Sequence, residues 1–331
     1  MTRAKFARHE YNEDVLPSVA SDYEQAVHDP KTHAFDLAHT LAFRQGLGNS
    51  LFASPHTAVE HEHALEFARH AFARPSVIAS GVEPATLKSL VADFFVTPDA
   101  NAAASSSSSS QPSTYHGGEV RVPSTGHSAT DHLLVAFKGG SVNQPEFAVL
   151  RHLLGGHSSL KWTPGASALS SLARPGLSAH AFNVAYSDAG LLGFWLEGPT
   201  NELQSLASGA VAELKKLASG QASAEDLKRA VAKAKFELAA LAETRTGQLA
   251  SLGAQIAAAG DVKTLDDSLA ALDAVSTDAI AKVRHTLSLC VLWLTERNLT
   301  LQAAESALKS KPTTVAYGDT HALPYADQLG L

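Results

Sequence analysis

A polar, low-complexity segment divides this chain into two parts and restricts its possible folds more than any other feature. The segment, TPDANAAASSSSSSQPST (97–114), contains six consecutive serines and no apolar pattern. Such a composition buries little surface and is typical of a flexible linker. With 331 residues, the chain is long enough for one domain on each side. We therefore predict domains at 1–96 and 115–331, joined by a linker at 97–114.

The part before the linker is rich in helical patterns and poor in strands. Apolar residues recur at helical spacing in four segments, and only SVIASG (76–81) has the character of a strand. Amphipathic helices need a surface on which to pack. Either these helices pack on one another, or the chain lacks the natural beginning of this domain. The predicted helices span 14–29, 31–45, 57–72 and 83–95.

The part after the linker combines strands with longer helices. Strands and helices are segregated along it instead of alternating strictly, which favours an α+β fold with an antiparallel or mixed sheet. The predicted strands are GEVRVPS (118–124), DHLLVAFKG (131–139), 177–188, 190–198 and 313–319. The predicted helices are 144–156, 200–219, 223–245, 246–259 and one that begins at Ser276.

Charge and cysteine content exclude several classes of protein. The net charge is −7 and no cluster of Lys and Arg occurs, which argues against nucleic acid as the main partner. A single cysteine, Cys290, forms no internal disulfide and indicates a reducing compartment. The longest apolar run, LSLCVLWL (287–294), is far shorter than the ~18 residues of a membrane span. The first residues, MTRAKFARHEYNED, resemble neither a secretory signal nor a transit peptide. Any membrane contact is therefore expected through partners.

The segment SPHTAVEHEHALEFARH (54–70) concentrates histidines and glutamates and raises the question of a zinc site. Zinc hydrolases place H-E-x-x-H or its inversion H-x-x-E-H on one helix, and neither pattern occurs here. A smaller group, His63, Glu66 and His70, shares one helical face and is the candidate for a divalent metal. We favour a solvated polar face instead, because helix-spaced His and Glu are common on exposed surfaces. The sequence thus predicts no metal site.

Other catalytic and cofactor motifs are also missing from the sequence. GLGN (46–49) and LLGGH (153–157) contain glycines but match neither the P-loop nor the dinucleotide-binding fingerprint. No G-x-S-x-G nucleophile motif occurs, and the apolar neighbours of Cys290 predict a buried thiol. We therefore predict no catalytic residue and no cofactor. The residues indicate either a protein without enzymatic activity or an enzyme whose site lies elsewhere.

Several strings together resemble one family. They are LAFRQGLGNSLF (41–52), ASGVEPATLKSLVADFF (79–95), HAFNVAYSDAGLLGFW (180–195) and KPTTVAYGDTHALPYADQL (311–329). In this order they resemble the core protein 2 family of mitochondrial ubiquinol–cytochrome c reductase (respiratory complex III), its fungal members in particular. That family is similar in fold to pitrilysin-type metallopeptidases and the mitochondrial processing peptidase. The resemblance implies two related α+β halves, each a mixed sheet with helices on one side.

The resemblance also implies a role. Core protein 2 is a non-catalytic structural subunit of the respiratory chain, peripheral on the matrix side of the inner membrane. Its expected partners are core protein 1, other complex III subunits and a second copy of itself. Quinone, haem and iron–sulfur sites belong to other subunits in this family, so no cofactor is expected in this chain.

This chain departs from the family pattern in two places. It begins well inside the first half, so the early strands of that half, and any transit peptide, have no counterpart. The block SLCVLWLTERNLTLQAAESA (288–307) interrupts the pattern before the final strand, and we interpret it as an insertion.

Two alternative functions follow from these departures. A presequence-processing peptidase subunit of the substrate-binding α type would need a mobile glycine-rich loop, for which LGGHSSLKWTPGAS (154–167) is the candidate. A truncated, non-functional product would expose the apolar faces of helices 57–72 and 83–95.

Overall fold

The chain forms two compact units that do not follow the order of the sequence. The computed structural model describes residues 6–55, 57, 59–71, 75–94, 112–124, 130–156, 167–218, 223–275 and 311–331. One unit, here called the sheet unit, comprises Pro30–Ser50, Ser113–Ala240 and Lys263–Leu331. The other, the helical unit, comprises Met1–Asp29, Leu51–Pro112 and Leu241–Val262.

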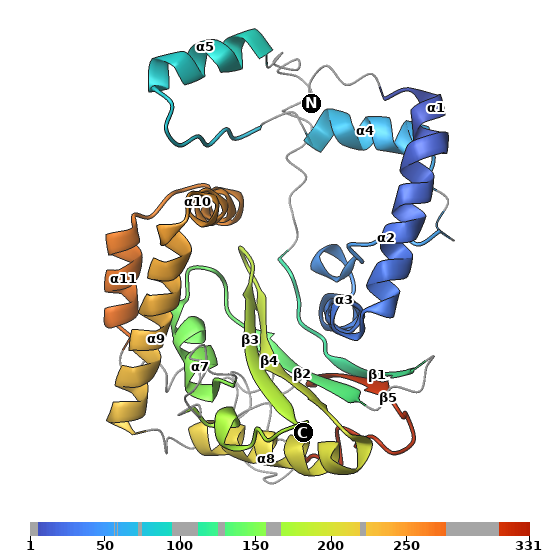
Figure 1. Ribbon diagram of the computed structural model, residues 1–331, viewed down its shortest axis with the longest axis vertical. Coiled ribbons are helices and arrows are strands. Elements are labelled where there is room, and N and C mark those ends of the chain that lie inside the picture. The colour runs from blue at the N-terminus through green and yellow to red at the C-terminus, as the bar shows by residue number, and fades with distance from the viewer. Residues whose placement is uncertain are drawn as a thin grey trace. The chain divides into compact units, whose positions relative to one another are not determined.

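The sheet unit contains one five-stranded mixed sheet in the order β1-β5-β2-β4-β3. β1 pairs with β5 in parallel, and the other neighbours are antiparallel. Figure 1 shows the strands side by side, with β3 and β1 at the two edges. The predicted mixed sheet is thus confirmed. The strands are β1 (Gly118–Pro123), β2 (Asp131–Gly139), β3 (Ser178–Ala185), β4 (Gly190–Gly198) and β5 (Thr313–Gly318).

The central strands are apolar on both faces because helices cover both. Successive side chains of a strand point to opposite faces. Accordingly, Leu133, Val135 and Phe137 of β2 join one hydrophobic cluster, while Leu134 and Ala136 join another. This explains the nearly continuous apolar runs of β2 and β4, which are typical of strands buried on both sides.

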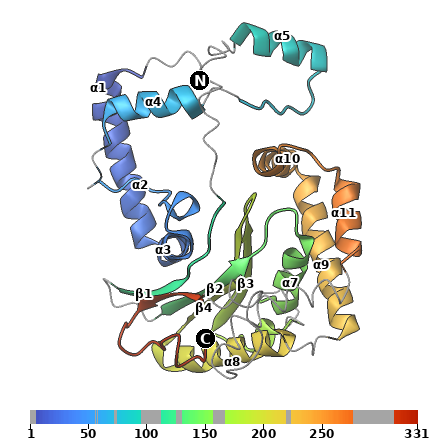
Figure 2. The same ribbon diagram turned by 180° about the vertical axis from the view of Figure 1, so that it is seen from behind.

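The first face is covered by helices from the second part of the chain (Figure 2). α7 packs on β3 and β4, and α8 packs on β4 and β2. Apolar residues of α7 and α8, with Ala230, Ala234 and Leu272, complete the main core. The helices are α7 (Pro145–Leu154), α8 (Thr200–Ala218), α9 (Ala224–Glu243) and α11 (Leu265–Asp273).

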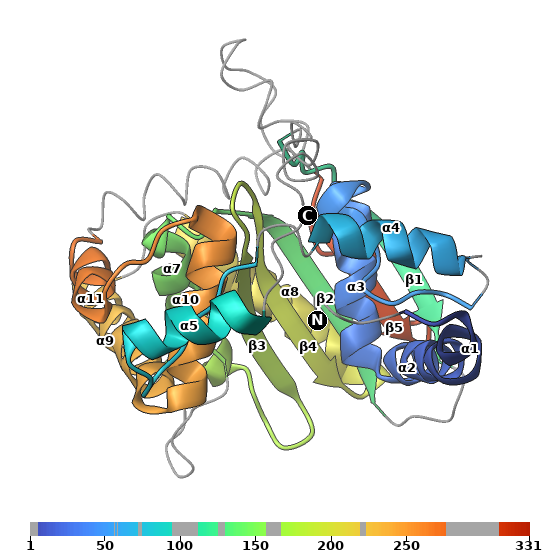
Figure 3. The same ribbon diagram turned by 90° about the horizontal axis from the view of Figure 1, so that it is seen from above.

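The second face carries a helix from the first part of the chain, α3 (Pro30–Phe43). Ala34, Ala38 and Ala42 recur every fourth residue and are each 0% exposed, so they form a stripe against the sheet. Side chains this small let the helix backbone approach the strands closely. α3 lies over β5, β2 and β1, as Figure 3 shows. The helix predicted at 31–45 therefore belongs to the sheet unit.

Aromatic contacts fix the position of α3. Phe35 meets Phe182 of β3 edge to face at 4.7 Å between ring centroids, and His33 meets Tyr317 of β5 at 5.9 Å. Burial lowers the pKa of His33, although the nearby Asp36 opposes this shift. His33 is therefore held in its neutral form at neutral pH, which suits its position between helix and sheet.

Arg121 of β1 fastens the C-terminal segment that follows β5. Its guanidinium donates hydrogen bonds to the carbonyls of Thr320 (2.6 Å), Leu323 (2.6 Å) and Pro324 (3.2 Å). It also lies 3.8 Å from the ring centroid of Tyr325. The side chain is 14% exposed, so these bonds are largely shielded from water. One residue thus connects an edge strand to the chain end.

Replacing Arg121 by methionine is expected to lower the free energy of unfolding by about 2–3 kcal/mol, because several carbonyls lose a charged donor. Limited proteolysis should then cleave within 319–331 faster than it does in the unchanged chain. Arg229→Met is the matched control, since Arg229 is 48% exposed and forms its ion pair with Asp226 on the same helix. Its cost should stay below about 0.5 kcal/mol. Equal midpoints of urea unfolding for both variants would contradict the role of Arg121.

The described residues of the helical unit contain helices and no strand. A helix runs from Arg8 through a wider π-type turn into α2 and ends at His28. The prediction of a strand at 76–81 is wrong. This segment is irregular, and the described residues of the helical unit contain no strand with which it could pair. None of the helices in the described part of the chain has the length and hydrophobicity that a bilayer crossing requires. The helices are α1 (Arg8–Glu10), α2 (Leu16–His28), α4 (His61–Ala71), α5 (Pro84–Phe94) and α10 (Arg245–Ala259).

Candidate functional site

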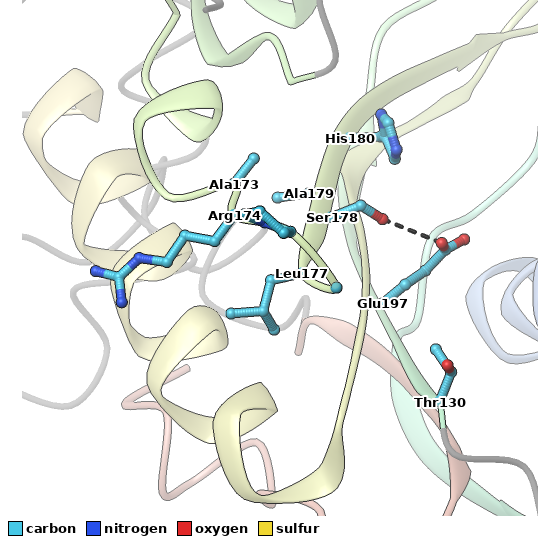
Figure 4. Close-up of a pocket in the computed structure, with 10 residues that line it drawn as sticks. Thr130, Ala173, Arg174, Leu177, Ser178, Ala179, His180 and Glu197 are labelled. Carbon is cyan, nitrogen blue, oxygen red and sulfur yellow. Dashed lines mark hydrogen bonds between the residues drawn. The ribbon is translucent and has the colours of Figure 1, made fainter.

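A surface pocket in the sheet unit lies where β3 begins and β4 ends. Its volume is about 520 Å³, and its polar lining comes from Thr130, Ser178, His180 and Glu197. In Figure 4, Ser178 and Glu197 point toward each other, while the side chain of Arg174 extends away from them. Ser178, His180 and Glu197 lie on the face of the sheet that also carries α3, toward its β3 edge.

One wall of the pocket is a tight turn, Arg174–Pro175–Gly176–Leu177. The Leu177 N–H donates to the Arg174 carbonyl at 2.8 Å, and the Arg174 N–H donates to the Leu177 carbonyl at 3.1 Å. Gly176 has a φ of +85°, a conformation that strains residues other than glycine. The ring of Pro175 fixes its own φ at a value that suits the preceding position of the turn. Buried Leu177 anchors the turn in the core. The sequence thus builds a rigid wall beside β3.

Strand register places Glu197 between two neighbours. It is the cross-strand partner of Ser178 on β3 and of His132 on β2. The Ser178 hydroxyl donates to Oε2 at 3.0 Å, and the Trp195 indole N–H donates to Oε1 at 2.5 Å. The His132 ring stacks on the Trp195 indole, with centroids 5.1 Å apart and planes inclined by 20°. Both carboxylate oxygens are thereby held in place.

These contacts keep Glu197 ionised. Burial alone would raise its pKa, but the hydrogen bonds from Trp195 and Ser178, with the nearby His132 and His180, hold the pKa below its ordinary value. A fixed negative charge therefore faces a partly open pocket. The serine donates directly to the carboxylate without an intervening imidazole, so the arrangement differs from that of a catalytic triad. Chemically, the site suits binding of a cation or hydrogen-bond donor.

The structure gives other roles to part of the histidine-rich segment of the helical unit. The Nδ1 atom of His63 accepts the Glu60 N–H at 3.2 Å and so caps the start of α4. His61 donates to the Phe6 carbonyl at 2.5 Å and meets the Tyr11 ring edge-on, which links α4 to the N-terminal helix. Glu66 is exposed.

The candidate metal group, His63, Glu66 and His70, is not fully covered by the structure, because the side chain of His70 lies outside the described residues. Within the described ranges, no three His, Cys, Asp or Glu residues gather in a manner that could hold a metal ion. The expectation of no metal site stays a prediction. Most of the loop candidate 154–167, Cys290 and the block 288–307 also lie outside the described residues.

A second polar cluster joins α7 to α9. Glu237 accepts a hydrogen bond from Arg151, and its Oε2 lies 3.0 Å from Nε2 of His152. The hydrogen bond from His152 and the charge of Arg151 lower the pKa of Glu237 to about 2, against the opposing effect of burial. Since its carboxyl binds fewer protons in the folded state, its stabilising effect is complete above its ordinary pKa of 4.5 and is lost as the pH falls toward 2.

Glu237→Gln is expected to lower the urea midpoint at pH 7 and to have a smaller effect at pH 3. The side chain is 55% exposed, so solvent screening limits the loss at pH 7 to about 1 kcal/mol or less. Glu225→Gln on the exposed start of the same helix is the control and should have little effect at either pH. If Glu237→Gln lowered the urea midpoint more at pH 3 than at pH 7, the stabilising role of the ionised Glu237 would be contradicted.

Comparison with known proteins gives concordant matches. Residues 70–234 match the family model described as Peptidase M16 inactive domain. The chain is 39% identical to the mitochondrial cytochrome b-c1 complex subunit 2 of Cryptococcus neoformans, covering 100% of this chain and 71% of that protein. It is 36% identical to the subunit of the same name from Neurospora crassa, covering 100% and 69%. The human subunit is 25% identical over 96% of this chain and 66% of its own length.

A solved structure with little sequence similarity to this chain has a similar fold. A chain of complex III2 from Candida albicans with Inz-5 bound matches with a TM-score of 0.73, although only 14% of residues are identical. The match covers 96% of this chain and 74% of that chain. The fold is thus the one found in that assembly.

Proposed function

This chain belongs to the family of mitochondrial cytochrome b-c1 complex subunit 2, and we propose that it is a non-catalytic structural subunit of respiratory complex III. The observation that carries the proposal is the continuous similarity to relatives of this one name, from fungi to human, across at least 96% of the chain. Its task in the respiratory chain would be assembly and stability, while the redox groups reside in other subunits.

Three observations support a role without catalysis. The segment 54–70 contains neither H-E-x-x-H nor H-x-x-E-H, the patterns that place two histidine ligands and a glutamate base on one helix. The family model that matches residues 70–234 describes an inactive domain. The polar pocket at Glu197 offers a charge for binding and no activated nucleophile.

Exposed apolar side chains of the helical unit are suited to partner contacts. Leu51 is 89% exposed, Phe67 74% and Phe94 63%, and α5 has no buried residue. Permanent subunit interfaces typically bury more than about 2,000 Å² and are more apolar than ordinary surface. We assign these side chains to contacts with core protein 1, with other complex III subunits or with a second copy of this chain. The proposed location is the matrix face of the inner membrane, held there through partners.

The domain organisation is part of the same proposal. It consists of a partial N-terminal peptidase-like domain at 1–96, the serine-rich linker at 97–114 and a C-terminal peptidase-like domain at 115–331, with an insertion at 288–307. α3 is the element of the first domain that packs on the sheet of the second. Sequencing the transcript tests the insertion, because a main message without codons for 288–307 would identify that block as a gene-model error.

Purification of the tagged chain from mitochondria tests the function. We expect core protein 1 and the cytochrome b-containing subunits to co-purify in constant ratio with the tag. Protease added outside intact inner membrane vesicles of matrix-side-in orientation should leave the chain intact and should digest it after detergent is added. Purification of the chain alone, or digestion before detergent, would overturn the proposed partners or the proposed side of the membrane.

A further inference from the structure

The pocket at Glu197 has the properties of a binding site for a positively charged group. Its carboxylate carries a full negative charge and is fixed by donors on both oxygens, Trp195 on Oε1 and Ser178 on Oε2. Each carboxylate oxygen has a second lone pair, so the group can accept further hydrogen bonds. Among the described residues that line the pocket, Arg174 is the one arginine, and its side chain extends away from Glu197 in Figure 4.

The shape of the pocket suits a side chain that arrives from outside the unit. α3 covers the same face of the sheet over β5, β2 and β1. Glu197, Ser178 and His180 of the pocket lie on the neighbouring strands β4 and β3. The turn Arg174–Leu177 and the first residues of β3 form rigid walls, and the volume of about 520 Å³ falls in the range of ordinary binding pockets.

Charge and geometry select the class of ligand. A carboxylate with both oxygens oriented forms its strongest hydrogen bonds with a guanidinium, whose planar donors match the two oxygens, and weaker ones with an ammonium group. Anions would be repelled by Glu197 and by the net charge of −7 of the chain. The expected ligand is thus a basic group.

We propose that this pocket receives an arginine or lysine side chain from a neighbouring subunit, with Glu197 as its ion-pair partner and Ser178 and Trp195 as positioning residues. The cation-binding property belongs to the chain itself. The identity of the donor as a subunit rests on the proposed function in complex III. These two parts are therefore tested separately.

The first test uses the purified full chain and N-acetyl-arginine amide, with N-acetyl-citrulline amide as the neutral probe of similar shape. The Trp195 indole N–H, which donates to Glu197, is the reporter in NMR spectra. We expect a saturable shift of its resonance with the arginine probe, at least about tenfold weaker binding of the citrulline probe, and weakening by added salt. Equal binding of both probes, or no saturable shift, would overturn the proposal.

Two variants test whether the arginine-dependent shift of the Trp195 resonance arises in the pocket. Glu197→Gln should abolish the arginine-dependent shift, whereas Glu202→Gln, an exposed residue of α8 with the same change of charge, should retain it. Retention of the shift in Glu197→Gln would also overturn the proposal. The comparison of the two probes on the unchanged chain requires no variant, so a folding defect in Glu197→Gln does not affect the test.

The second test identifies the source of the cation. Carbodiimide coupling to glycine ethyl ester modifies accessible carboxylates, and mass spectrometry reports the modified fraction of Glu197. We expect labelling in the isolated chain and at least about fivefold less in the purified assembly, where a partner side chain fills the pocket. Equal labelling in both would refute the subunit as donor while leaving the cation site intact. A chain that never enters the assembly would refute the proposed function and, with it, the subunit donor.

Discussion

Replacement of Phe194 by alanine is expected to lower the free energy of unfolding by about 3–5 kcal/mol, which is among the largest effects available in this chain. Phe194 lies at the centre of β4, is 0% exposed and pairs across the sheet with Val135 and Ala181. Its ring fills space between the sheet and the helices of the main core, so alanine would leave a cavity. A lower urea midpoint with an unchanged slope would measure this loss.

Phe236→Ala provides the matched control, because it removes the same side chain from a surface position. Phe236 lies on α9 and is 66% exposed. Its replacement should change the free energy of unfolding by no more than about 0.5 kcal/mol. Equal urea midpoints for the two variants would contradict the placement of the Phe194 side chain in the main core.

The second large effect is expected from Ala38→Glu, which places a carboxylate in the interface between α3 and the sheet. Ala38 is 0% exposed and packs in the cluster of Leu134, Trp195 and Val315. A charge buried there without a partner costs about 3–5 kcal/mol, or the helix leaves the sheet. Hydrogen exchange would detect the second outcome as a loss of protection at 34–43 together with faster exchange at β5.

Thr40→Glu adds the same charge to the same helix on its exposed side. Thr40 is exposed and its hydroxyl donates to the Asp36 carbonyl at 3.2 Å. The substitution brings a like charge four residues from Asp36, which costs only a few tenths of a kcal/mol, about 0.2–0.5. Protection at 34–43 should remain. The same result in both variants, whether protection is lost or kept, would contradict the role of the alanine stripe.

Periodicity predicts the elements of the sheet unit well because each has a strong local pattern. β2 and β4 were expected at 131–139 and 190–198, and the structure places them at Asp131–Gly139 and Gly190–Gly198. α11 was not predicted, although Thr264 and Asp267 form a reciprocal capping box at its start. A search for Ser or Thr three residues before an acidic residue would have indicated that helix.

Long-range relations were less predictable from local pattern. The strand expected at 76–81 fails because a strand requires a partner, and no strand occurs in the described residues of the helical unit. The apolar spacing of 31–45 predicted a helix, but nothing local says that its alanines meet the sheet of the second part of the chain. Similarly, Ser178, His132 and Glu197 lie far apart in sequence, and only strand register brings them together. The sequence pattern made His63 a weak candidate for a metal ligand and favoured a polar, solvated face, and it did not predict that the His63 Nδ1 caps α4.

A native gel of mitochondria that express this chain with a C-terminal tag tests whether the chain is a structural subunit of complex III. The gel is stained for the tag and for haem, in cells that lack any other copy of this subunit. We expect the tag to migrate with a haem-containing band of the size of the dimeric complex. A tag found only in small or aggregated species, beside an intact haem-containing complex, would contradict the structural role.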